Sequence, residues 1–225
     1  MHIFRIPKFV YGIYKNFIWE IPSDEKVLYL TFDDGPTETA TKWILEILEK
    51  YNAEATFFCV GQNAKNNPKL LKSITDAGHS VGNHTYNHLN NRETDTDKYF
   101  ENVEKCAEII NSKLFRPPYG RISSKQATKL LDNKYKIIMY SVLTNDFDTD
   151  LFPNFILQKS IKQTKTGSIV VFHDSIKAFE NLKFVLPKYL EYFFEQGYSF
   201  KKIVDKDKIS NPPTEKNPLS FSANE

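Results

Sequence analysis

The stretch TFDDGP at positions 31–36 directly follows the apolar run VLYL at 27–30. An almost unbroken apolar run bounded by charged residues is typical of a strand that is buried on both faces, as in a parallel sheet. Asp33 and Asp34 therefore stand at the end of a buried strand. Two adjacent carboxylates repel each other there and are costly to desolvate, so we expect a positive group close to them.

The rest of the chain alternates between strand-like and helix-like segments. Apolar segments predict about seven strands, at 26–33, 55–60, 79–83, 114–116, 136–143, 168–173 and 199–204. Between them, apolar residues recur at helical spacing in 43–51, 67–78, 95–111, 123–133, 154–164 and 178–196. This alternation predicts an α/β fold with a parallel sheet and crossover helices, either doubly wound or closed into a barrel.

The composition is that of an ordinary soluble domain. The chain has 225 residues, of which 40% are apolar and 26% are charged, and this length fits one domain. The net charge of +2 and the lack of a Lys/Arg run argue against binding to nucleic acid. Cys59 and Cys106 each lie within an apolar segment, which favours two buried free thiols over a disulfide. We expect a monomer.

Residues 1–22 differ from the regular pattern that follows them. They contain no uninterrupted apolar core and no small-residue cleavage site, so a standard secretory signal is not predicted, and they are too short and interrupted to span a membrane. We expect the segment to pack an apolar stripe on its own domain, and binding to a membrane surface is the alternative. A cytoplasmic location is favoured, with export by another route left open. The apolar residues at helical spacing are Ile3, Ile6, Phe9, Val10, Ile13, Phe17 and Ile18.

Ionisable side chains collect where the predicted strands end. In a parallel α/β fold the carboxyl ends of the strands meet on one face, where sites are built, so these side chains should converge. Taken singly, each has an ordinary structural explanation: Asp34-Gly35-Pro36 is good turn chemistry, and a His-x-x-x-His spacing occurs by chance. One shared site explains all of them together. The residues are Asp33, Asp34, His84, His88, Arg116, Asp146, His173 and Asp174.

Three of these residues form a set of oxygen and nitrogen ligands without a cysteine: Asp34, His84 and His88. Such a set suits Zn²⁺ or a similar divalent cation and leaves coordination positions open for water and substrate. The cation would neutralise the carboxylate pair, with Asp34 as a ligand and Asp33 free beside a metal-bound water. A water held in this way has a pKa of about 7, and a neighbouring carboxylate can remove its proton.

Five motifs occur in an order and spacing that resemble the polysaccharide deacetylase family (NodB-homology domain, carbohydrate esterase family 4). They are TFDDGP at 31–36, HTYNH at 84–88, RPPYG at 116–120, NDF at 145–147 and VVFHD at 170–174. The resemblance covers residues 26–204 and implies one domain at 23–204, folded as a distorted (β/α) barrel of about seven parallel strands. Residues 205–225 are polar and aperiodic, which predicts a solvated tail.

The resemblance also implies roles in proton transfer for several motif residues. Asp33 would be the catalytic base, and Arg116 would hold its carboxylate. His173 would be the general acid, with Asp146 tuning its pKa. The backbone N–H of Tyr119 would help to bind the oxyanion that forms when water attacks the acetyl carbonyl.

By the same resemblance, the metal ligands would be Asp34, His84 and His88, and the cation would be Zn²⁺, with Co²⁺, Mn²⁺ or Ni²⁺ as alternatives. Phe147 and Val171 would line the pocket for the acetyl methyl group, and Pro117 would be a further substrate-binding residue. Two positions depart from the common family pattern: Phe147 stands where members commonly have Trp, and Leu143 replaces a residue that is often acidic. These departures affect substrate contacts and leave the catalytic set intact.

The implied reaction is metal-dependent removal of N-acetyl groups from an amino-sugar oligosaccharide or polysaccharide, of the chitooligosaccharide or peptidoglycan type. A second hypothesis uses the same site to hydrolyse an O-acetyl ester or another small amide. A third is a glycan-binding module without catalysis. A glycan-binding module would need neither a catalytic base nor a general acid, whereas this sequence has residues for both.

Overall fold

The elements of the fold follow the predicted alternation of strands and helices. A computed structural model describes residues 2–205, so the predicted tail at 205–225 lies outside the described residues, apart from Asp205. The strands are β1 (Phe17–Ile18), β2 (Val27–Asp33), β3 (Ala55–Cys59), β4 (Ser80–Asn83), β5 (Leu114–Phe115), β6 (Lys136–Ile138), β7 (Val142–Leu143), β8 (Ile169–His173) and β9 (Ser199–Phe200). The helices are α1 (Lys8–Ile13), α2 (Ala40–Lys50), α3 (Gly61–Asn66), α4 (Pro68–Asp76), α5 (Thr96–Ala107), α6 (Ser124–Asp132), α7 (Pro153–Gln163), α8 (Phe179–Glu195) and the 3-10 helix η1 (Pro118–Gly120).

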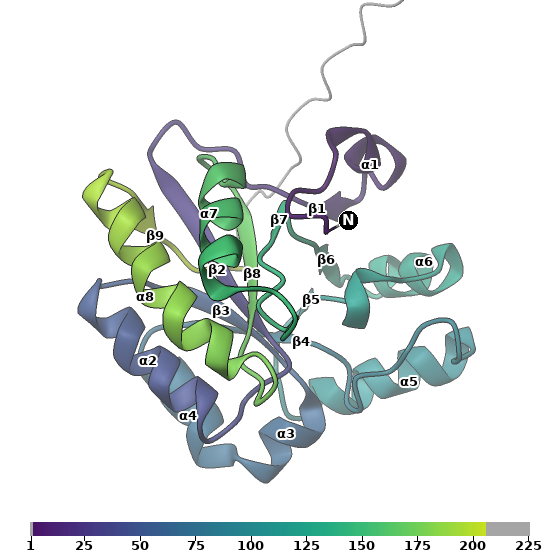
Figure 1. The fold of residues 1–225 in the computed structure, drawn as a ribbon. Helices are drawn as coiled ribbons and strands as arrows, with labels where there is room; N and C mark the ends of the chain where they lie inside the picture. The colour runs from purple at the N-terminus through teal and green to yellow at the C-terminus, as the bar shows by residue number, and fades with distance from the viewer. Residues whose placement is uncertain (1, 206–225) are drawn as a thin grey trace, which may run out of the picture.

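A single parallel sheet forms the centre of the molecule. Its order is β1-β6-β5-β4-β3-β2-β8-β7, and β9 pairs with the start of β2. The larger helices lie around the outside of the strands (Figure 1). The predicted single-domain, distorted (β/α) barrel is confirmed, with nine strands among residues 2–205 in place of the seven expected.

The strands β6 and β7 come from one apolar segment but lie far apart in the sheet order. Our prediction of a single strand over 136–143 is therefore wrong. Met139 N donates to Ile18 O at 2.7 Å, and Ser141 N donates to Ile169 O at 3.0 Å, so the chain crosses from the β1 side of the barrel to the β8 side. Both strands are buried, and hydrophobicity alone could not mark the break between them.

The N-terminal segment lies where the two ends of the curled sheet approach each other. Figure 1 shows α1 and β1 beside β6 and β7. Leu143 N donates to Phe4 O at 3.0 Å, and Ile21 N donates to Gly167 O at 2.9 Å. The segment thereby connects β6, through its pairing with β1, to β7 and β8. It supplies backbone hydrogen bonds that the ends of an open sheet would otherwise lack.

Side chains of this segment are part of the core. Tyr11 and Trp19 are buried, and their rings stack with centroids 5.2 Å apart. Arg5 and Glu20 form an ion pair across the segment. The helical spacing of its apolar residues predicts a longer helix than the structure has, since α1 spans only Lys8–Ile13. The residues after α1 are extended and pair with β6.

The middle of the core is an aromatic stack on three adjacent strands. The ring of Phe32 on β2 lies 5.0 Å from that of Phe57 on β3 and 5.8 Å from that of Phe172 on β8. The predicted free thiols are confirmed, since Cys59 and Cys106 are both buried and unbridged. Within residues 2–205, no helix is long and apolar enough to cross a membrane.

The burial of Trp19 gives a direct test of the N-terminal segment. We expect Trp19→Ala to lower the free energy of unfolding by about 3–5 kcal/mol, because it removes a large side chain from the core. Phe9→Ala, on the same segment, should change it by less than about 0.5 kcal/mol, since Phe9 is 70% exposed. Urea unfolding monitored by circular dichroism measures both. Equal, small effects would show that the segment does not stabilise the barrel.

Candidate active site

Motif residues meet in one cleft at the carboxyl ends of the strands. The cleft has a volume of about 570 Å³, and its lining includes Asp33, Asp34, His84, His88, Tyr119 and His173. A larger groove of about 720 Å³ beside His79 contains none of the motif residues, so the chemistry belongs to the smaller cleft. The convergence predicted from the strand ends is found here.

Asp33 is buried at the end of β2 with a cationic partner beneath it. Arg116 Nη1 donates to Asp33 Oδ1 at 2.8 Å. The guanidinium of Arg116 is fully buried, and it also donates to Thr31 Oγ1 and to the carbonyl oxygens of Ile138 and Met139. With one oxygen of Asp33 held by Arg116, the carboxylate is fixed in position and its charge is compensated.

Asp34, His84 and His88 bring three donor atoms within 4.8 Å of one another. The Oδ1 atom of Asp34 lies 3.6 Å from His84 Nε2 and 3.1 Å from His88 Nε2. Because His84 Nδ1 lies 2.7 Å from the carbonyl oxygen of Arg116, that nitrogen donates and the Nε2 lone pair faces Asp34. Burial would raise the pKa of Asp34, but the two histidine side chains beside it hold the pKa well below its usual range. This donor set fits a divalent cation.

The two histidines are held by a tight turn. Thr85 N donates to Asn83 Oδ1 at 2.9 Å, and Leu89 N donates to Thr85 Oγ1 at 3.0 Å. These side-chain bonds keep Thr85 and His88 at positive φ values of 61° and 54°. The side chains of Asn83 and Thr85, on either side of His84, therefore hold the turn that carries both histidines.

Asp174 orients the loop that carries Asp34, a role that we did not predict. Its carboxylate accepts hydrogen bonds from Gly35 N at 2.8 Å and Thr41 Oγ1 at 2.5 Å. A Cβ atom on Gly35 would lie 1.8 Å from Asp174 Oδ2, so only glycine fits there. Burial raises the pKa of Asp174 to about 7, against the effect of these hydrogen bonds. The only sequence signal for this role was the position of Asp174 at the end of the VVFHD motif.

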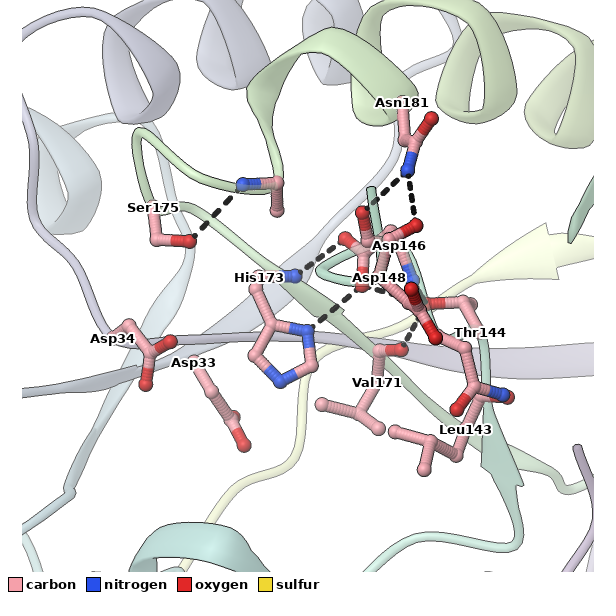
Figure 2. Close-up of polar contacts among 12 residues, drawn as sticks. Asp33, Asp34, Leu143, Thr144, Asp146, Asp148, Val171, His173, Ser175 and Asn181 are labelled. Carbon is pink, nitrogen blue, oxygen red and sulfur yellow. Dashed lines mark hydrogen bonds and ion pairs between the residues drawn. The ribbon is translucent and has the colours of Figure 1, made fainter. Parts of the chain in front are cut away.

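His173 lies between acidic groups on two sides, with Asp146 on one and Asp33 and Asp34 on the other (Figure 2). Asp146 Oδ1 lies 2.8 Å from His173 Nδ1, and Oδ2 accepts from His173 N at 2.8 Å. Nδ1 therefore carries a proton, and Nε2 is left for the cleft. Burial by itself would lower the pKa of His173, but Asp146, with Asp34 and Asp33, raises it to about 9.

Two further side chains hold Asp146 in place (Figure 2). Thr144 Oγ1 lies 2.9 Å from Asp146 Oδ1. Asn181 on α8 donates through Nδ2 to the carbonyl oxygens of Asp146 and Asp148, at 2.9 and 3.0 Å. Sequence analysis missed both residues: Thr144 stands just before the NDF motif and outside it, and Asn181 lies 35 positions from Asp146 in the chain.

Tyr119 has a strained backbone, with φ 60° and ψ 11° inside η1. Of the seven non-glycine residues at positive φ in the described chain, five belong to the loops around this cleft: Asp34, Thr85, His88, Tyr119 and Asn145. Such strain concentrates at functional sites, where the surrounding structure enforces it. The backbone N–H of Tyr119 has no acceptor among residues 2–205.

The predicted substrate contacts are only partly in the cleft. Phe147 lines it, with its ring 4.9 Å from that of His173. Val171 and Pro117 are buried and do not line the cleft, which corrects our expectation. Val171 lies two residues before His173 on the same face of β8 and is covered, whereas its neighbour Leu143 on β7 lines the cleft.

Comparison with known proteins agrees with this geometry. The sequence profile described as "Polysaccharide deacetylase" matches residues 20–138. The chain belongs to the polysaccharide deacetylase family. The resemblance based on five motifs is thus confirmed.

Several relatives in this family are similar over most of the chain. A peptidoglycan-N-acetylglucosamine deacetylase of Bacillus cereus is 35% identical, over 81% of this chain and 88% of the relative. A chitooligosaccharide deacetylase of Azorhizobium caulinodans is 30% identical, over 68% of this chain and 76% of the relative. The crystal structure of a peptidoglycan N-acetylglucosamine deacetylase matches with a TM-score of 0.81 and 29% identity, over 88% of this chain and 95% of the other.

One structural relative has a different description. A pseudoenzyme of carbohydrate esterase family 4 from Bacillus anthracis matches with a TM-score of 0.72 and 29% identity, over 82% of this chain and 66% of that one. The family and the named relatives support a polysaccharide deacetylase, and its metal dependence and mechanism are to be argued from the residues of the cleft.

Removal of one member of the donor set tests the cation site. We expect Asp34→Ala or His88→Ala to lose most of the bound divalent ion, since a site with three protein ligands cannot spare one. Mass spectrometry of the metal content after dialysis against Zn²⁺ measures the stoichiometry. His2→Ala, which removes a half-exposed histidine paired with Asp148, should leave it unchanged. Full stoichiometry in either ligand variant would refute the assignment.

Proposed function

We propose that this protein is a metal-dependent hydrolase that removes N-acetyl groups from an amino-sugar oligosaccharide or polysaccharide, with Zn²⁺ bound by Asp34, His84 and His88. The observation that carries the proposal is the pairing of each proton-transfer group with an opposite charge in one cleft. Asp33 is paired with Arg116, and His173 is paired with Asp146. A binding module would need neither pair.

The first half of the proposed reaction is attack of water on the acetyl carbonyl carbon. A divalent cation bound to the donor set would supply Lewis acidity, polarising the carbonyl and acidifying a water molecule. Asp33 accepts the proton of the attacking water through the carboxylate oxygen that Arg116 does not hold. The backbone N–H of Tyr119 donates a hydrogen bond to the carbonyl oxygen as negative charge develops on it.

The second half is departure of the sugar amine. An amine is a poor leaving group and must gain a proton as the carbon–nitrogen bond breaks. His173 Nε2 donates this proton, and Asp146 stabilises the imidazolium. The bond from carbon to the water oxygen forms, the bond to nitrogen breaks, and the products are acetate and a free amino sugar. Leu143 and Phe147 provide apolar contact for the acetyl methyl group.

Release of acetate tests the proposal. We expect the protein to release acetate from N-acetylated chitotetraose or from purified peptidoglycan glycan strands, because both present the bond that the cleft is arranged to break. Dialysis against a chelator should abolish the release, and Zn²⁺ should restore it. An enzyme-coupled acetate assay measures the rate.

The same assay separates the competing hypotheses. Acetate released only from O-acetylated xylan would favour the esterase. Binding to the glycans without release of acetate from any of them would favour the non-catalytic module and refute the proposal.

The role of His173 gives a sharper prediction. His173→Ala should lower kcat for an N-acetyl glycan by about 10²- to 10⁴-fold, because the amine then leaves without a general acid. The loss should be much smaller for 4-nitrophenyl acetate, whose leaving group hardly needs a proton. The metal content should stay at the wild-type level. Equal losses on the two substrates, or loss of the metal, would exclude His173 as the acid.

The pH dependence of kcat checks the same role. His173 acts as its imidazolium, and its pKa is raised to about 9, so activity should be present below that pH and fall above it. Asp146→Asn removes the main charge that stabilises the imidazolium and should move the alkaline limb to lower pH. Asp148→Asn, the same chemical change two residues away, should not move it. An alkaline limb unchanged in Asp146→Asn would refute the pairing.

A further inference from the structure

A second hollow adjoins the catalytic cleft, between the N-terminal segment and the loop that follows β5. It has a volume of about 480 Å³ and is lined on one side by Ile6, Val10 and Tyr14. Gly120, Arg121 and Tyr140 line both this groove and the catalytic cleft, so the two hollows adjoin at these three residues. A glycan chain is longer than one sugar, and its next unit needs a place to lie beside the cleft.

The charges along this groove are all positive. The charged residues that line it are Arg92 and Arg121, and no acidic side chain does so. Both arginines are exposed, and neither has an ion-pair partner among residues 2–205. Lys177 lines the catalytic cleft itself and has no ion-pair partner among the described residues. Cations without ion-pair partners in the groove and in the adjoining cleft favour an anionic ligand.

The opposite wall of the groove suits the apolar face of a sugar ring. Tyr14 is 40% exposed, and its ring stacks on that of Phe17 with centroids 5.1 Å apart. This stacking holds the Tyr14 ring in place, so little conformational entropy is lost when a ligand packs on it. The groove therefore combines a fixed aromatic surface with a guanidinium at the junction to the cleft.

We propose that this groove binds the sugar next to the one that is deacetylated, and that Arg121 binds a carboxylate carried by that neighbouring unit. The inference rests on the proposed function and makes it more specific. The protein would prefer an N-acetyl glycan that carries a carboxylate, such as a strand containing muramic acid, to a neutral N-acetyl glycan. The guanidinium of Arg121 offers a planar fork that matches a carboxylate, and its position in both hollows lets it reach a substituent of the adjacent sugar. The N-terminal segment gains a second role as a wall of the substrate groove.

Four tetrasaccharides test this proposal with the zinc-loaded protein of 225 residues. The first is neutral chitotetraose, and the second alternates N-acetylglucosamine with N-acetylmuramic acid carrying a free lactyl carboxylate. The third is the methyl ester of the second, which keeps its size and removes its charge. The fourth carries short peptides, so that its carboxylates belong to the peptide and the lactyl group is an amide. Acetate release gives kcat and KM for each.

We expect the wild-type protein to have a lower KM for the free-acid tetrasaccharide than for its methyl ester. Arg121→Gln should raise KM for the free acid about three- to fivefold more than for the ester, with kcat little changed, as suits one exposed ion pair. Arg121→Lys should restore part of the difference, and 0.5 M NaCl should shrink it. Lys125→Gln, the same loss of charge at an exposed position on α6, should have no such effect. If the effect of Arg121→Gln appears instead on the peptide-bearing substrate, the carboxylate that Arg121 binds belongs to the peptide.

Equal KM values for the free acid and the ester, together with no selective effect of Arg121→Gln on the free-acid or peptide-bearing substrate, would overturn the inference. Chitotetraose separates that failure from failure of the proposed function. Acetate released from it at a normal rate leaves the deacetylase intact even where the groove has no preference. No release from any of the four would refute the deacetylase itself.

Discussion

The fully buried guanidinium of Arg116 is the constraint on which the site and the barrel both depend. A charge inside a protein is tolerated only when all of its donors find partners, and removing one partner from a buried pair costs about 3–5 kcal/mol. Arg116, at the end of β5, takes its partners from Thr31 and Asp33 on β2 and from the carbonyl oxygens of Ile138 and Met139 at the end of β6. β2 and β5 are separated in the sheet by β3 and β4, so these contacts are possible only because the sheet curls.

The two proton-transfer groups of the cleft, Asp33 and His173, differ in the charge of their buried partners. Asp33 is held by the guanidinium of Arg116, and His173 is paired with Asp146, which stabilises the imidazolium. The proposed base and the proposed acid, which face one cleft, therefore each have a partner of opposite charge. The cation donor set lies beside Asp33 because the backbone at Asp34 turns to a positive φ of 83° directly after it, in a loop held by Asp174.

Sequence analysis predicted the features that depend on local pattern. The buried run before Asp33 and the alternation of strands and helices were enough for the barrel, and the strand ends were enough for the residues of the cleft. The sequence-based predictions were wrong where packing between distant segments determines the structure. The segment 136–143 is mostly apolar and contains no Gly or Pro, yet its middle leaves the sheet, and the curl of the barrel determines that point. The family resemblance placed Val171 in the cleft, but this residue lies further back along β8 than His173 and is buried. The groove at the N-terminal segment forms only when distant parts of the chain come together, so the sequence pattern could not predict it.

The central claim is that Asp33, held by Arg116, is the base of a deacetylase. The most direct measurement is acetate release from an N-acetylated glycan by Asp33→Asn, with metal content and circular dichroism measured on the same sample. The amide keeps an oxygen for Arg116 and cannot accept the proton of water. The account predicts a folded protein that binds metal at the wild-type level and has lost about 10²- to 10⁴-fold in kcat. A folded, metal-loaded Asp33→Asn protein that releases acetate at the wild-type rate would contradict it.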